Sequence, residues 1–122
     1  MWEYERLVRM RDTDATGALF FGAAFEIAVE AFEEWLYVRG IRLEKETFAL
    51  PIVHAEATYL APVKLGDLLQ IQLKVKKMGI TSFTTEASFK QGCVTITHVA
   101  VAKGTGHKIE IPDVLKDLSS EM

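Results

Sequence analysis

The chain has 122 residues, 49% hydrophobic and 25% charged, which is typical of one globular domain with its own core. Its formal net charge of −3 gives no overall basic field, and this argues against nucleic acid as a partner. We find no membrane span and no signal peptide before the first strand, and the single cysteine, Cys93, excludes an internal disulfide. We therefore expect one domain over residues 1–122, in the reducing cytoplasm.

The chain opens with a predicted strand and a short loop. The strand signal is an imperfect alternation of apolar and charged residues, whose apolar members are Trp2, Tyr4, Val8 and Met10. The loop that follows holds two carboxylates, Asp12 and Asp14, and a glycine, Gly17. It leads directly into an amphipathic segment. Unpaired amides at a helix start attract an anion or a polarised carbonyl oxygen, so Asp14 and these amides together predict a reaction centre.

A long helix is predicted from Gly22 to Arg39, and Gly40 supplies the stop. Glutamates follow one stripe of this segment, and the opposite face is apolar and broad. The apolar face is formed by Phe25, Ala28, Val29, Phe32, Trp35 and Leu36. So broad a face needs to be covered, and the rest of the chain supplies strands to cover it.

Four further strands are predicted from alternation and from β-branched residues. They run over residues 53–61, 69–76, 82–89 and 93–103. Gly66-Asp67 and Gln91-Gly92 supply turns, Pro112 is placed to begin a last helical turn, and the tail after it is expected to fray. One long helix between a first strand and four consecutive antiparallel strands is an α+β plan.

Three segments and their order resemble the hotdog-fold acyl-CoA thioesterases of the 4-hydroxybenzoyl-CoA thioesterase family. Residues 9–17 match a signature that reads roughly R-x-x-D-x-D-x-x-G. Residues 59–67 look like the family's Y-x-x-P-x-x-x-G-D segment, and residues 79–83 are similar to the start of its next strand. The resemblance implies the hotdog fold, in which a five-stranded antiparallel sheet wraps around one long central helix.

The resemblance also implies roles for residues. Asp14 would be the catalytic carboxylate, acting as nucleophile or as general base on water, and a backbone N–H of Phe21 or Gly22 would polarise the thioester carbonyl. Asp12 would support the loop by capping, and Arg9 by pairing with a carboxylate. The residues implied to surround the substrate are Gly17, Phe20, Ala24, Tyr59, Thr81 and Ser82. Taken alone, the two aspartates would be read as closing a turn before a helix.

The sequence departs from the family after the glycine of the loop. Many relatives carry Tyr or His in the aromatic pair and Asn soon afterwards, whereas this chain has Phe20-Phe21 and then Gly22-Ala23-Ala24. Asp14 is therefore the one polar side chain of the loop expected to do chemistry. The apolar replacements predict a drier acyl pocket, and they also keep a role in binding open.

We expect most of the other polar residues to have structural roles. Glu30 lies on the polar stripe of the helix, although a second hotdog type places its catalytic carboxylate there, which makes Glu30 the alternative to Asp14. The histidines and Cys93 show no metal-ligand spacing, so we expect no metal and no cofactor. Lysines of the last strands are candidates to meet CoA phosphates, but exposed strands carry lysines for other reasons.

The expected function is hydrolysis of an acyl-CoA to a carboxylic acid and CoA. The alternatives are an acyl-carrier-protein thioesterase and a non-catalytic acyl-thioester binder. The resemblance implies a homodimer, often doubled into a homotetramer, with Asp14 of one chain facing Tyr59 and Ser82 of the other. An open sheet edge also favours pairing across a two-fold axis. The physical alternative is a monomer whose edges are blocked by Lys64 and Lys90.

Overall fold

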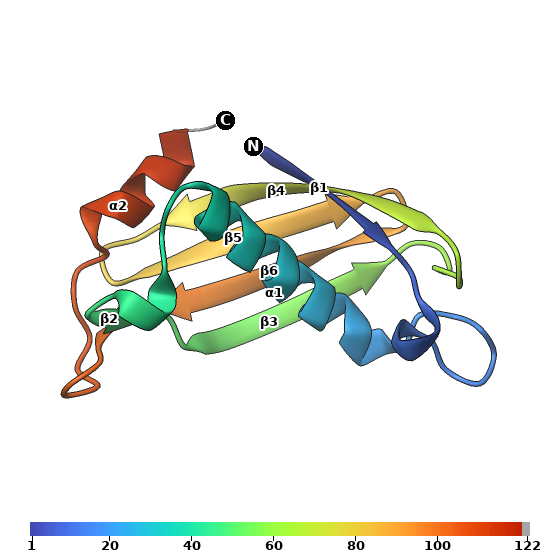
Figure 1. Ribbon diagram of the computed structural model, residues 1–122, viewed down its shortest axis with the longest axis horizontal. Helices are drawn as coiled ribbons and strands as arrows, with labels where there is room; N and C mark the ends of the chain where they lie inside the picture. Colours follow the sequence, from blue (N-terminus) through green and yellow to red (C-terminus); the bar gives the residue numbers. More distant parts are fainter. Residues whose placement is uncertain (121–122) are drawn as a thin grey trace.

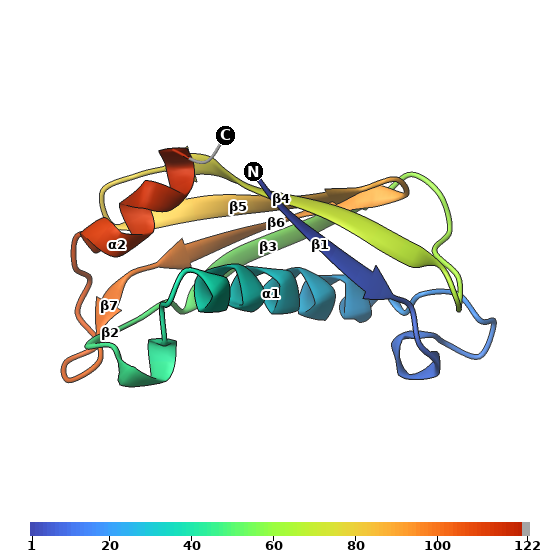
Figure 2. The same ribbon diagram turned by 45° about the horizontal axis from the view of Figure 1, so that its top comes forward.

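The computed structural model describes residues 1–120, which form a curved antiparallel sheet with one long helix along one of its faces (Figures 1 and 2). The five strands of the sheet lie in the order β1-β4-β5-β6-β3. Their bounds are β1 Trp2–Leu7, β3 Ile52–Tyr59, β4 Leu68–Met78, β5 Ser82–Phe89 and β6 Gly92–Val99. The predicted α+β plan is confirmed in these residues.

Short elements complete the fold. Strands β2 (Phe48–Ala49) and β7 (Val101–Ala102) pair with each other, and the sequence did not predict β2. The remaining short helical elements are η1 Met10–Asp12, η2 Leu43–Lys45, α2 Asp113–Lys116 and η3 Asp117–Ser120. Met10 therefore belongs to a 3₁₀ turn, not to the first strand as predicted. Val8 lies outside β1 too, but it is buried in the core.

Helix α1 (Phe21–Val38) agrees with its predicted bounds to within one residue. Gly40, at φ +81°, takes the left-handed conformation that commonly ends a helix. The apolar face of α1 packs on the inner face of the sheet, where Trp35, Leu36 and Phe83 are almost fully buried. The sheet thus covers the broad apolar face that the sequence predicted.

Strand β3 forms one of the two edges of the sheet. Strand β3 pairs with β6 on one side, and every β3 residue except Ala57 is exposed. Within residues 1–120 no strand pairs with the other side of β3. The alternation of apolar and polar residues that predicted this strand does not give it a buried face, because α1 does not cover the edge of the sheet.

The C-terminal segment is ordered where fraying was expected. Leu115 of α2 and Leu118 of η3 are each at most 1% exposed and join the same core as Ile111. Figure 2 shows α2 at the end of the sheet where β4 leads into β5. The expectation was wrong because three apolar side chains at helical spacing bind this segment to the core; residues 121–122 lie outside the described part.

His98 is buried on the inner face of β6 at 4% exposure. Its ring stacks on Phe32 and Phe83, with centroid distances of 4.8 Å and 5.2 Å. Its Nδ1 lies 3.0 Å from the carbonyl oxygen of Leu50, while Nε2 has no hydrogen-bond partner among the described residues. Burial lowers the pKa of His98 below its ordinary value, so the imidazole is neutral in the folded protein near neutral pH.

We expect acid to destabilise the fold through His98. The unfolded chain takes up this proton more readily than the folded chain, so the free energy of unfolding falls as the pH drops below about 6.5 toward the lower pKa of the folded state. The loss is about 1.4 kcal/mol for each unit that separates the two pKa values. Urea unfolding of wild type and His98→Phe at about pH 7.5 and about pH 5 measures this contribution. An equal loss in both proteins would contradict it.

Candidate active site

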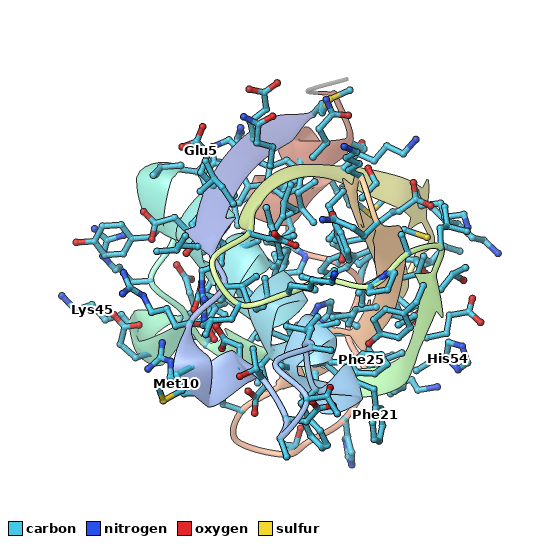
Figure 3. The ribbon with its side chains drawn as sticks, turned by 90° about the vertical axis from the view of Figure 1, so that its right-hand side faces the viewer. Glu5, Met10, Phe21, Phe25, Lys45 and His54 are labelled. Carbon is cyan, nitrogen blue, oxygen red and sulfur yellow. The ribbon has the colours of Figure 1, made fainter. Side chains whose placement is uncertain are left out.

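The loop between β1 and α1 is fixed by backbone pairing. Thr13 bridges to Leu19, and Ala18 bridges to Lys64 in the segment that leads to β4. Gly17 has φ +81°, a left-handed conformation that explains the glycine of the predicted signature. Figure 3 looks onto the end of the molecule that carries this loop, where Met10 and Phe21 also lie. The loop is therefore a defined turn and not a flexible connection.

Asp14 is exposed in this loop and is held as a carboxylate. The hydroxyl of Thr16 donates to Oδ1 at 2.6 Å, and the N–H of Thr16 donates to the same oxygen at 2.8 Å. These bonds stabilise the anion and hold the pKa of Asp14 below its ordinary value. Both bonds go to Oδ1, so Oδ2 is the oxygen that Thr16 leaves available. Thr16 was not among the predicted site residues, although Asp followed two residues later by Thr is a known turn pattern.

Replacing Thr16 by Val is expected to raise the pKa of Asp14. The hydroxyl bond is lost while the backbone bond and the side-chain shape are kept. If the ionised Asp14 is needed for reaction, the acid limb of kcat/KM moves to higher pH than in wild type. The pH profile of thioester hydrolysis measures this shift, with Thr13→Val as the control because Thr13 bonds to the Met10 carbonyl instead. An unchanged acid limb would show that Asp14 is not the titrating group.

A partly buried ion-pair network holds the loop against β1 and α1. Arg6 on β1 binds both oxygens of Asp12, at 2.7 Å and 3.1 Å, and its Nε binds Oε2 of Glu30 at 2.9 Å. Tyr4 donates to the same Glu30 oxygen at 2.6 Å. The Arg6 guanidinium holds the pKa of Asp12 below its ordinary value. This network ties β1, the loop and the middle of α1 together.

The network corrects the predicted role of Arg9 and the predicted solvation of Glu30. Asp12 supports the loop as predicted, since its Oδ2 also accepts the backbone N–H of Arg9 at 2.8 Å. Its guanidinium partner, however, is Arg6 and not Arg9, whose side chain is exposed. Glu30 is half-buried and accepts both bonds at Oε2, so it is not the solvated stripe residue expected. It remains the alternative catalytic carboxylate to Asp14.

The start of α1 offers backbone donors. The side chain of its N-cap residue, Phe20, makes no capping hydrogen bond within the described structure. The first N–H groups of a helix have no acceptor inside it, so those of Phe21 and Gly22 can polarise a carbonyl oxygen. The ring of Phe20 folds against Phe21 at 4.9 Å and over Gly22, where a Cβ would come within 2.9 Å of it. Glycine at position 22 thus leaves the space that the Phe20 ring occupies.

Two predicted substrate residues lie far from this loop within one chain. Thr81 and Ser82 are at the hairpin between β4 and β5, at the opposite end of the sheet from the 13–20 loop (Figure 1). Tyr59, in contrast, lies at the helix start of its own chain, where its hydroxyl donates to the Phe21 carbonyl at 2.6 Å. The expectation that Tyr59 faces Asp14 of another chain stays a prediction.

The predicted acyl pocket is only partly present. Ala23 and Ala24 are at most 5% exposed, and Ala24 borders a core cavity of about 10 Å³, the size of one water molecule. An open groove of about 470 Å³ lies instead between α1 and β3, within the range of small-molecule sites. It is lined by Phe25, Glu26, Val29, Glu30, Glu33, Ile52, Ala55 and Ile96. Figure 3 shows Phe21 and Phe25 at the loop end of the molecule.

Two features are absent from the described residues, a group of metal ligands and a membrane-spanning helix. Among residues 1–120 there is no group of three or more His, Cys, Asp or Glu side chains placed to hold a metal ion. Within the same residues no helix is long and apolar enough to cross a membrane.

Comparison with known proteins shows the family to which this chain belongs. Residues 8–118 match the thioesterase-like superfamily. The chain is 38% identical over 124 residues to a 1,4-dihydroxy-2-naphthoyl-CoA hydrolase of Nostoc punctiforme, covering 90% of this chain and 80% of that protein. It is 35% identical over 127 residues to the enzyme of that name from Synechococcus sp. (strain CC9605), covering 91% and 84%.

A solved structure gives the same result. The crystal structure of a 1,4-dihydroxy-2-naphthoyl-CoA thioesterase from Synechocystis superposes with a TM-score of 0.88 at 27% identity, over 98% of this chain and 96% of that one. The sequence match spans the β1–α1 loop, the helix and all four later strands of the sheet. This chain therefore belongs to the thioesterase-like superfamily and has its hotdog fold, as the sequence resemblance predicted.

Proposed function

We propose that this protein is an acyl-CoA thioesterase that hydrolyses an aromatic acyl-CoA to the free acid and CoA. The observation that carries the proposal is Asp14, an exposed carboxylate held ionised by Thr16 in the loop that precedes α1. The relatives named as 1,4-dihydroxy-2-naphthoyl-CoA hydrolases support a fused aromatic ring in the acyl group. The family match over residues 8–118 supports a single domain over residues 1–122.

Two routes use the same carboxylate. As a general base, Asp14 takes a proton from water, whose oxygen adds to the thioester carbon. As a nucleophile, its carboxylate oxygen adds directly and forms an anhydride that water then hydrolyses. In both routes a helix-start N–H of Phe21 or Gly22 binds the carbonyl oxygen as negative charge develops there. In the first route the thiolate of CoA leaves and takes up the proton that Asp14 removed from water. In the second route it leaves as the thiolate, and the later hydrolysis of the anhydride by water restores the Asp14 carboxylate and releases a proton, so neither route requires a strong acid.

We also propose that the working unit is a homodimer, which can double into a tetramer. The open edge of β3 supports pairing with the same strand of a second chain across a two-fold axis. Antiparallel pairing of this kind would bring Thr81 and Ser82 of one chain toward the 13–20 loop of the other. It would also close the groove between α1 and β3, whose apolar floor is open in a single chain.

Thiol release from a panel of acyl-CoAs tests the function. The panel contains benzoyl-CoA, 2-naphthoyl-CoA and aliphatic acyl-CoAs, and the same acyl groups on a phosphopantetheinylated carrier protein. We expect turnover with the aromatic CoA esters above the others. Binding without thiol release would support a non-catalytic acyl-thioester binder, the alternative that the apolar residues after Gly17 keep open. Turnover only on the carrier protein would reassign the substrate.

Light scattering tests the assembly separately. We expect the mass of a dimer or a tetramer at micromolar concentration. A monomer would contradict the shared-edge arrangement and would favour blocking of the sheet edges by Lys64 and Lys90. Because hydrolysis and mass are measured independently, either proposal can fail without the other.

A further inference from the structure

The hydroxyl of Tyr59 contacts the peptide unit at the start of α1. It donates to the carbonyl oxygen of Phe21 at 2.6 Å, across 38 positions of sequence. Burial raises the pKa of Tyr59 above its ordinary value, so the phenol stays protonated and remains a donor at neutral pH. This contact joins the last residue of β3 to the first residue of α1.

The Phe21 carbonyl and the Gly22 N–H belong to one planar peptide group. A hydrogen bond donated to the carbonyl oxygen draws electron density toward that oxygen and leaves the N–H of the same group more positive. Hydrogen bonds linked in this way strengthen one another. The Tyr59 hydroxyl therefore acts on Gly22, one of the two backbone donors proposed for the thioester carbonyl.

Tyr59 is held in place by strand pairing. It pairs with Gly92 at the end of β6, and the next N–H, that of Leu60, donates to the Gln91 carbonyl at 2.7 Å. A Cβ on Gly92 would lie 2.2 Å from the Thr58 carbonyl oxygen, so the two strands approach too closely for any larger residue. The phenol thus extends from a fixed backbone and not from a mobile loop.

A relative with polar side chains after the loop glycine can use them as donors to the substrate. This chain has only backbone donors there. Positions 20–24 hold Phe, Phe, Gly, Ala and Ala, so no side chain there can donate to the substrate. Any increase in the donor strength of a helix-start N–H acts directly on the negative charge that develops in the transition state.

We propose that Tyr59 is a positioning residue for the oxyanion site of its own chain, acting through the Phe21-Gly22 peptide. It orients and polarises the Gly22 N–H without touching the substrate. The inference rests on the proposed thioesterase function and adds to it. It differs from the expectation that Tyr59 faces Asp14 of another chain.

Tyr59→Phe removes only the hydroxyl, and Tyr37→Phe is the matched control. Tyr37 lies on the exposed side of α1, with its ring under the Arg42 guanidinium at 3.7 Å. With 2-naphthoyl-CoA we expect kcat to fall about three- to tenfold in Tyr59→Phe, less than the loss of a whole oxyanion donor, with KM and the melting temperature unchanged. We expect Tyr37→Phe to match wild type. A wild-type kcat in Tyr59→Phe would overturn the inference.

Vibrational spectroscopy separates polarisation from a merely structural effect. The probe is 2-naphthoyl-CoA with ¹³C at the thioester carbonyl, bound to Asp14→Asn so that it is not consumed. We expect the carbonyl stretch to shift to lower frequency on binding, and to shift less in Asp14→Asn/Tyr59→Phe. Equal shifts in the two proteins would overturn the inference, whatever the kinetics. Wild-type protein that releases no thiol would instead refute the proposed function.

Discussion

Asp14→Asn is expected to lower kcat for thioester hydrolysis by about a hundredfold or more, with the fold intact. The amide keeps the size of the side chain and still accepts the two bonds from Thr16 at one oxygen. It can neither take a proton from water nor attack the thioester carbon. Since the interaction is lost in the transition state, kcat and kcat/KM should fall together. Steady-state thiol release on the best aromatic acyl-CoA measures both.

Glu30→Gln is the matched control for this prediction. Its remaining carbonyl oxygen can still accept from Tyr4 and Arg6, so we expect turnover to fall much less than in Asp14→Asn. If Asp14→Asn instead keeps near-normal turnover while Glu30→Gln is inactive, the catalytic carboxylate lies on α1. The two variants therefore distinguish the two carboxylates that the family resemblance left as candidates.

Arg6→Met is expected to destabilise the fold by about 3–5 kcal/mol, because it leaves Asp12 as a buried carboxylate without its guanidinium. The Arg6 and Asp12 side chains are only 11% and 6% exposed, so water cannot replace the lost partner without a rearrangement. For a domain of this size the melting temperature would fall by about 10–20 °C. Thermal and urea unfolding of the purified variant measure the loss.

Arg9→Ala is the comparison that tests the corrected assignment. Arg9 is exposed and offers its backbone N–H to Asp12, which the alanine variant keeps. We expect a change in the free energy of unfolding of no more than about 0.5 kcal/mol. A larger loss in Arg9→Ala than in Arg6→Met would restore the original prediction that Arg9 is the carboxylate partner.

The sequence predicted the helix and the sheet because their periodicities are local. The apolar stripe of α1 and the alternation in β4 record which side of each element is buried, and both agree with the structure. The glycine of the loop signature was also informative, since position 17 requires a left-handed backbone. These features are repeated or conformationally specific, so they can be recognised without knowledge of the tertiary contacts.

The contacts around the candidate site could not be predicted in the same way. Arg6 and Arg9 are both cations close to Asp12 in sequence, and only the tertiary fold decides which one is buried beside it. Within one chain Thr81 and Asp14 lie at opposite ends of the sheet, and the proposed contact between them requires a second chain. The C-terminal leucines also gave no periodic signal long enough to show that they pack in the core.

Mixing two inactive variants tests the central claim, a thioesterase site built around Asp14 and completed by a second chain. Asp14→Asn and Ser82→Trp subunits are first shown to be folded, separately inactive and able to exchange. In a dimer with shared sites, each hybrid has one site with both defects and one intact site. An equal mixture should then recover about a quarter of wild-type activity. A mixture that stays inactive after confirmed subunit exchange would contradict the account.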